Sequence, residues 1–96
     1  MTDHEEQQRI EDNLAVIRSY LRDKFPEYDI TEDSPYPSMY HKFAITNLKL
    51  YKCYKLHVSW PRLSDLENTP AKTRAALDHD DVAGRMIAAD GDRFYW

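Results

Sequence analysis

The sequence predicts a small α+β domain in which helices cover one face of a three-stranded, mainly antiparallel sheet. Apolar residues recur every three or four positions in the first quarter of the chain and at every second position in its middle. The first spacing is typical of an amphipathic helix and the second of a half-buried strand. After residue 70, a stretch that contains several alanines again predicts a helix. The expected order is α-β-β-β-α(α), in a single globular domain over residues 1–96.

The first helix is expected from about Glu5 to Phe25. Its apolar residues fall on one stripe, at Ile10, Leu14, Ile17, Leu21 and Phe25. Pro26 ends the helix, because proline disfavours helical geometry in the residue before it and lacks a backbone donor. Residues 1–4 are expected to be disordered.

Three strands are expected next, at about 28–32, 40–46 and 50–60, where β-branched and aromatic residues dominate the last two. Two prolines in Ser34-Pro-Tyr-Pro-Ser38 predict a loop after the first strand. Residues 47–49 are the expected turn between the other two. In the third strand, alternation predicts one apolar face: Leu50, Tyr54, Leu56, Val58 and Trp60. The opposite face is then Tyr51, Cys53, Lys55, His57 and Ser59.

Pro61 is expected to close the sheet region, and two helix starts compete after it. Ser64 and Glu67 have the spacing of a capping box, whereas Thr69-Pro70 offers a threonine cap followed by proline in the first turn. Either start predicts a helix over 71–77. A last short helix is expected over 82–89, capped by Asp81 and stopped near Gly91.

Composition indicates a globular, cytoplasmic protein. The chain is 42% hydrophobic and 31% charged, which favours a folded domain over disorder. Its acidic, polar N-terminal stretch is unlike a secretory signal, and its apolar runs are too short to span a membrane, so we expect no membrane partner. The single cysteine, Cys53, cannot form an internal disulfide.

The net charge of −4 conceals a partition along the chain. Residues 34–63 contain no acidic residue and five lysines or arginines, whereas the segments before and after are acidic. The expected sheet is therefore basic and the helices acidic. One interpretation is that lysines keep the strands soluble and blunt their edges. The other is that the basic, aromatic strands bind an anionic partner.

The chain ends in three aromatic residues, 94–96. They can dock on the domain's own core or open sheet face, or they can anchor a partner or a second copy of the chain. Together, the basic strands and this tail give the predicted partner-binding residues: Lys42, Lys49, Tyr51, Lys55, His57, Tyr95 and Trp96.

No catalytic, cofactor-binding or metal-binding residues are predicted. The cluster Asp78-His79-Asp80-Asp81 lies on a short turn, where adjacent side chains rarely converge on one cation, and spaced zinc ligands are missing. Alternation places Cys53, His57 and Ser59 on one face, but the basic segment offers no acid to complete a triad. A hydrolase-like activity at Cys53 and His57 is kept only as a third possibility.

The element order resembles that of double-stranded RNA-binding domains. The matching residues are Pro26-Glu-Tyr28 at the first strand, Phe43 in the second, and Ala71-Lys-x-x-Ala75-Ala76-Leu77 in the later helix. The resemblance implies a similar topology over roughly residues 10–80. The chain departs from the family where Pro35-Tyr36-Pro37 replaces a glycine-containing loop and where the lysine-rich helix start is reduced to Lys72 and Arg74. It therefore does not transfer the family's function.

The function expected from the sequence is that of a non-catalytic binding or regulatory module. It would act through the exposed basic sheet face and the C-terminal aromatic residues, on a protein partner or in a homodimer. The alternative is an RNA- or DNA-binding module that uses strands 41–59. These alternatives differ in salt dependence, because contacts to nucleic-acid phosphates weaken steeply as salt rises.

Overall fold

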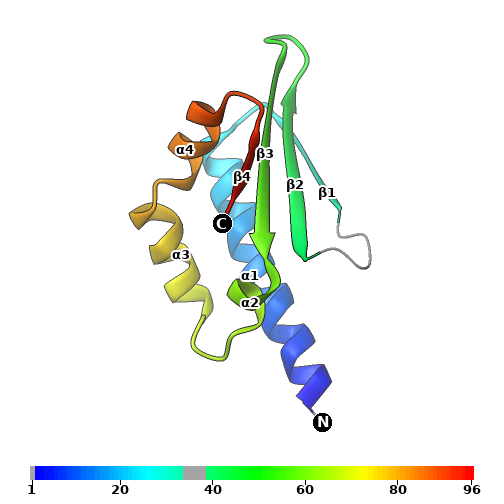
Figure 1. Ribbon diagram of the computed structural model, residues 1–96, viewed down its shortest axis with the longest axis vertical. Coiled ribbons are helices and arrows are strands. Elements are labelled where there is room, and N and C mark those ends of the chain that lie inside the picture. The colour runs from blue at the N-terminus through cyan, green and yellow to red at the C-terminus, as the bar shows by residue number, and fades with distance from the viewer. Residues whose placement is uncertain (1, 34–38) are drawn as a thin grey trace.

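The computed structural model describes residues 2–33 and 39–96 and contains four helices and four strands within those ranges (Figure 1). The predicted loop at Ser34–Ser38 lies outside the described residues. The elements follow one another as α1 (Thr2–Lys24), β1 (Asp29–Asp33), β2 (Tyr40–Asn47), β3 (Lys52–Ser59), α2 (Trp60–Ser64), α3 (Pro70–His79), α4 (Val82–Ala89) and β4 (Arg93–Tyr95).

The α+β class is confirmed, but the prediction of a three-stranded sheet is wrong. The sheet has the order β1-β2-β3-β4, and its first three strands are antiparallel. The fourth strand runs parallel to β3, pairing Arg93 with Lys55 and Tyr95 with His57. The expected order α-β-β-β-α(α) lacked this strand, because three residues are too few for a period-two pattern to be distinguished from an apolar tail.

The helices bury one face of the sheet. The predicted stripe of α1 lies in the core, where Ile17 and Leu21 are fully buried. Opposite it, alternate residues of β2 and β3 are buried, among them Phe43, Ile45 and Leu56. Figure 1 shows α1 behind the sheet and α3 and α4 on the side of β4. This one-sided packing leaves the other face of the sheet uncovered by the helices that the structure describes.

Some local expectations are corrected, and the choice between two helix starts is decided. Leu50, assigned to the apolar face of a strand, lies in the β2–β3 turn and is 57% exposed. Pro61 follows the end of β3 as expected, but it lies in the first turn of a short helix, α2, that was not expected. Of the two candidate helix starts, the structure uses Thr69, whose hydroxyl accepts a hydrogen bond from the Lys72 amide. The position of Asp81 before α4 is as expected, but its side chain makes no capping hydrogen bond.

A buried amide, Asn13 of α1, joins the N-terminal helix to α2, to the connection that follows α2, and to α3. Its Nδ2 donates to the carbonyls of Leu63 and Asn68, at 2.9 and 2.8 Å. Its Oδ1 accepts from the Thr73 hydroxyl at 2.9 Å. All three contacts bridge 50 or more positions of sequence. Because Asn13 is fully buried, removing its side chain leaves several polar groups without a hydrogen-bond partner.

We predict that Asn13→Leu lowers the free energy of unfolding by about 2–4 kcal/mol, since it leaves two carbonyls and a hydroxyl without their partner. Urea unfolding measures the loss. Gln8→Leu is the control, because Gln8 makes one exposed hydrogen bond, to Asp12 on the same helix. Equal stability of the two variants would contradict the role given to Asn13.

Candidate functional site

The uncovered side of the sheet, called here the open face, carries every second residue of the strands. The cross-strand register places Asp33, Lys42, His57 and Tyr95 in one row. The adjacent row contains Thr31, Ala44, Lys55 and Arg93. Residues that lie far apart in the sequence therefore meet on this face.

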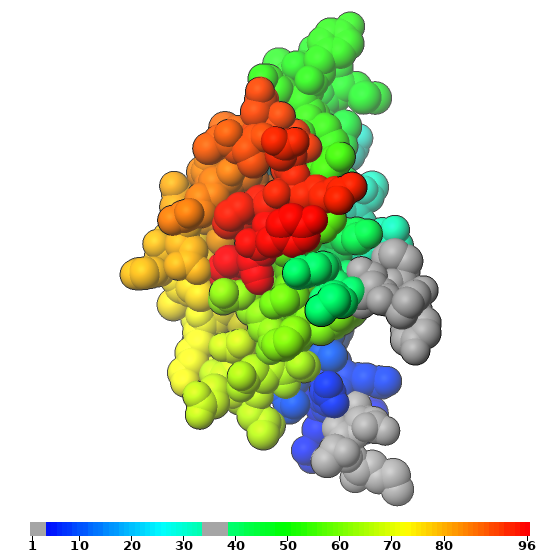
Figure 2. Space-filling view, in the orientation of Figure 1, coloured from blue at the N-terminus to red at the C-terminus, as the bar shows by residue number. Residues whose placement is uncertain are grey.

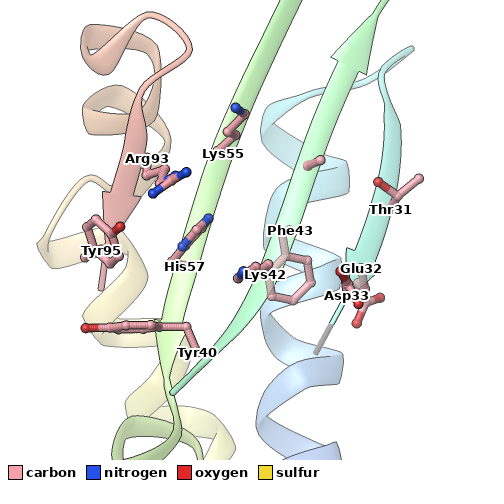
Figure 3. Close-up of a pocket in the computed structure, with 11 residues that line it drawn as sticks. Thr31, Glu32, Asp33, Tyr40, Lys42, Phe43, Lys55, His57, Arg93 and Tyr95 are labelled. Carbon is pink, nitrogen blue, oxygen red and sulfur yellow. The ribbon is translucent and has the colours of Figure 1, made fainter. Parts of the chain in front are cut away.

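These two rows form a depression of about 430 Å³, which we call the basic depression (Figure 3). Its lining comes from all four strands and consists of Thr31, Glu32, Asp33, Tyr40, Lys42, Phe43, Ala44, Lys55, His57, Arg93 and Tyr95. The volume lies within the usual range of small-ligand sites. Ala44 lies between bulkier neighbours, and its small side chain leaves space in the middle of the sheet.

Three cations of the lining lie on three adjacent strands: Lys42 on β2, Lys55 on β3 and Arg93 on β4. None of them forms an ion pair with a residue that the structure describes. In Figure 3 Glu32 and Asp33 lie on the β1 side, whereas Lys55 and Arg93 lie beside His57. The β3–β4 side of the basic depression is therefore positively charged.

Glu32 is already engaged by other groups. Arg18 of α1 donates to both of its carboxylate oxygens, at 2.6 and 2.9 Å, and His41 Nε2 lies 2.8 Å from Oε1. Partial burial works to raise the pKa of Glu32, but the hydrogen bonds from Arg18 and His41 outweigh it and lower the pKa. The carboxylate of Glu32 is thus engaged by Arg18, which also pairs with Glu11, and by His41, and not by the cations of the depression.

His57 lies at the centre of the charged group and is 7% exposed. Burial lowers the pKa of its imidazole below 6.5, and the nearby charges of Lys42, Arg93 and Lys55 lower it further. The imidazole is therefore mainly neutral at neutral pH. It can donate or accept one hydrogen bond there without adding a charge.

Aromatic rings form the border of the depression at the same end of the sheet. The Tyr95 ring lies 5.1 Å from the rings of both Tyr40 and His57, in edge-to-face contact with each. Tyr95 is still 50% exposed. The basic depression thus combines cations with an apolar border that has hydroxyl groups.

Trp96 holds β4 in place. Its amide donates to the His57 carbonyl, and its indole Nε1 donates to Asp80 at 2.8 Å. The Arg62 guanidinium lies 4.0 Å from the indole ring, and its Nε donates to the Trp96 carbonyl. Figure 2 shows the C-terminal residues packed between α4 and β3. These contacts position Arg93 and Tyr95 on the open face.

The structure divides the residues predicted for partner binding into three groups. Lys42, Lys55, His57 and Tyr95 line the basic depression. Lys49 and Tyr51 lie in the β2–β3 turn, at the end of a hairpin that extends beyond the helices (Figure 1). Trp96 docks against its own chain, one of the two alternatives left open for the tail.

Sequence reasoning missed Arg93 as a site residue. The only signal was the alternation in Arg93-Phe94-Tyr95, in which Phe94 packs on the core and its neighbours face the other way. That signal covers three residues. It indicates a strand only once the parallel pairing of these residues with β3 is known.

The acidic cluster before α4 has structural roles. The Asp80 carboxylate accepts from Trp96 and lies 3.1 Å from His79 Nδ1. Asp81 adopts a left-handed conformation at the start of α4. Within residues 2–33 and 39–96, no group of three or more possible metal ligands converges. No described helix is long and apolar enough to cross a membrane.

Comparisons with protein-family models, curated proteins and solved structures found no match to this chain.

We predict that Lys42→Gln raises the pKa of the His57 imidazole, because Lys42 lies opposite His57 and is the charge that lowers it most. Lys49→Gln, a matched change in the turn, should leave it unchanged. NMR titration of the ring protons measures both. In the unaltered protein, the lowered pKa makes the unfolded chain the stronger proton acceptor, so the His57 contribution destabilises the fold as pH falls through about 6.5. A pKa of His57 at or above 6.5 would contradict this electrostatic description.

We predict that Trp96→Ala releases β4, because it removes the indole hydrogen bond to Asp80 and the ring under Arg62. Amide hydrogen exchange should accelerate in residues 93–96 and stay unchanged in β1 and β2. Leu66→Ala, at a position that is 77% exposed, is the control. Unchanged protection of β4 in Trp96→Ala would show that Trp96 does not hold the strand.

Proposed function

We propose that this protein is a non-catalytic binding module whose basic depression takes an acidic segment of a protein partner. The observation that carries the proposal is the meeting of Lys42, Lys55 and Arg93 at one depression, without an ion-pair partner among the described residues. Charged groups arranged in this way favour a complementary partner and accelerate its association.

Protection of sheet edges does not explain these charges. Lysines that discourage sheet aggregation belong on edge strands, whose backbone groups are unpaired. Lys42 and Lys55 lie on β2 and β3, which have a paired strand on each side. Their side chains also line the basic depression and are not spread over a flat surface. The arrangement is therefore better explained by binding than by solubility alone.

The small extent of the basic surface favours a protein segment over a nucleic acid. Asp33 lies opposite Lys42 and borders the depression on the β1 side. The chain as a whole has a net charge of −4, so its long-range field repels a polyanion. A short acidic segment can contact the cations without crossing the acidic border. A second copy that docked through the same face would bring the same cations against each other.

Binding of single-stranded nucleic acid is the second candidate. The observation that favours it is the presence of Tyr40, His57 and Tyr95 on the same face as the cations, since bases stack on aromatic rings. A strand long enough to follow the sheet would also reach Lys49 and Tyr51 in the β2–β3 turn.

The proposed setting is the cytoplasm. Cys53 is a free and exposed thiol, and the reducing conditions of the cytosol keep such thiols reduced.

We predict that a glutamate-rich peptide shifts the amide NMR signals of residues lining the depression, and that Lys55→Glu weakens this binding by about tenfold or more, because it reverses a contacting charge. Lys49→Glu makes the same change of net charge in the turn and should weaken binding less than about twofold. Titration of the labelled protein at low and physiological salt measures both.

Single-stranded RNA of mixed sequence provides the competing arm. If RNA binds more tightly than the peptide, and both lysine variants weaken it, the nucleic-acid function replaces the one proposed. If neither probe shifts the signals of the depression at low salt, binding of anions by this face is refuted.

A further inference from the structure

The charge of the basic depression exceeds what a single carboxylate can balance. Its lining contains three cations and two acids. One of those acids, Glu32, lies opposite the buried Phe43 and is engaged by Arg18, which also pairs with Glu11, and by His41; neither Arg18 nor His41 belongs to the lining. Among the described lining residues, Asp33 on the β1 border is then the acid left to oppose the three cations. The depression therefore has an excess of about two positive charges, since His57 is mainly neutral at neutral pH.

The donors of the depression suit an anion with several oxygens. Lysine offers three donors on a point charge and arginine a planar fork of five. Arg93 lies directly opposite Lys55 in the register, and Lys42 lies opposite His57, so the donors approach from three strands. A phosphate monoester has three terminal oxygens and close to two negative charges at neutral pH, whereas a carboxylate has two oxygens and one charge.

The remaining space suits the chain that carries such a group. About 430 Å³ is several times what a phosphate fills, and the border contributes the rings of Tyr40 and Tyr95. Tyr95 is half exposed and can contact the aliphatic part of a side chain. The described helices do not cover this face of the sheet, so an extended segment can lie across it (Figure 1).

From this match of charge, donors and space, we infer that the basic depression recognises a phosphorylated side chain in the acidic segment of its protein partner. The inference rests on the proposed function and specifies its ligand. Lys42, Lys55 and Arg93 contact the phosphate oxygens, and Tyr40 and Tyr95 contact the segment on either side.

The test compares three peptides of one sequence, which differ at a single central position that is phosphoserine, glutamate or serine. Each is titrated into the labelled full-length protein while the amide signals are recorded. The phosphoserine peptide should bind at least about tenfold more tightly than the glutamate peptide, because it adds charge and an acceptor oxygen at the same place. Its shifts should centre on the residues of the depression.

Two variants test the contacts separately. Arg93→Gln and Lys42→Gln should each weaken binding of the phosphoserine peptide by about tenfold, since each removes a charged donor. The second variant keeps the test valid if the first loosens β4. Lys49→Gln is the matched control in the turn and should bind as the unaltered protein does.

The outcomes separate this inference from the proposed function. Equal binding of the glutamate and phosphoserine peptides at the depression would overturn the phosphate inference and leave the acidic-segment function standing. Failure of all three peptides would overturn both. Inorganic phosphate is the last arm: if it binds as tightly as the phosphoserine peptide, the ligand is a free phosphate and the inference of a protein-borne group is wrong.

Discussion

The return of the chain end as a strand parallel to β3 is the constraint on which the site depends. Antiparallel hairpins alone would produce a three-stranded sheet with two cations on its open face. The parallel strand adds Arg93 beside Lys55 and Tyr95 beside His57. Because a strand of three residues contributes few backbone hydrogen bonds, its position depends on the contacts of Trp96 with Asp80 and Arg62. The candidate site is therefore complete only when the C-terminus is packed against the rest of the domain.

That strand can reach its place only because the helices fix the route of the chain. Asn13 joins α1 to the segment that begins α3, and the Tyr20 hydroxyl accepts from the Ala83 amide at the start of α4. Both side chains are fully buried, so breaking these hydrogen bonds would leave polar groups unsatisfied away from water, which is costly in free energy. They align α3 and α4 along one side of α1, which directs the end of α4 toward β3. Polar contacts in the core thus determine where the charged residues of the open face lie.

The sequence was informative where a pattern is long and local. The stripe of α1 and the alternation of β3 extend over many residues, and both predicted the buried faces of those elements. The same alternation predicted that Lys55 and His57 share a face. It could not reveal Arg93, because the pairing of β4 with β3 is a contact between distant segments. Nor could it separate Lys49 and Tyr51 from the depression. The β2–β3 turn extends to Tyr51, whose backbone is left-handed although tyrosine rarely adopts that conformation.

The electrostatics of the open face would link the proposed binding of an anion to the stability of the fold. Lys55 and Arg93 occupy facing positions on adjacent strands, and like charges so placed repel each other. Their field also opposes protonation of His57, which is buried among them. The fold tolerates this repulsion because the apolar core lies on the other face of the sheet. An anion bound in the basic depression would offset the repulsion and would have no equivalent site in the unfolded chain, so it must stabilise the folded protein. The repulsion among these cations in the free domain is thus the physical reason why the proposed partner is anionic.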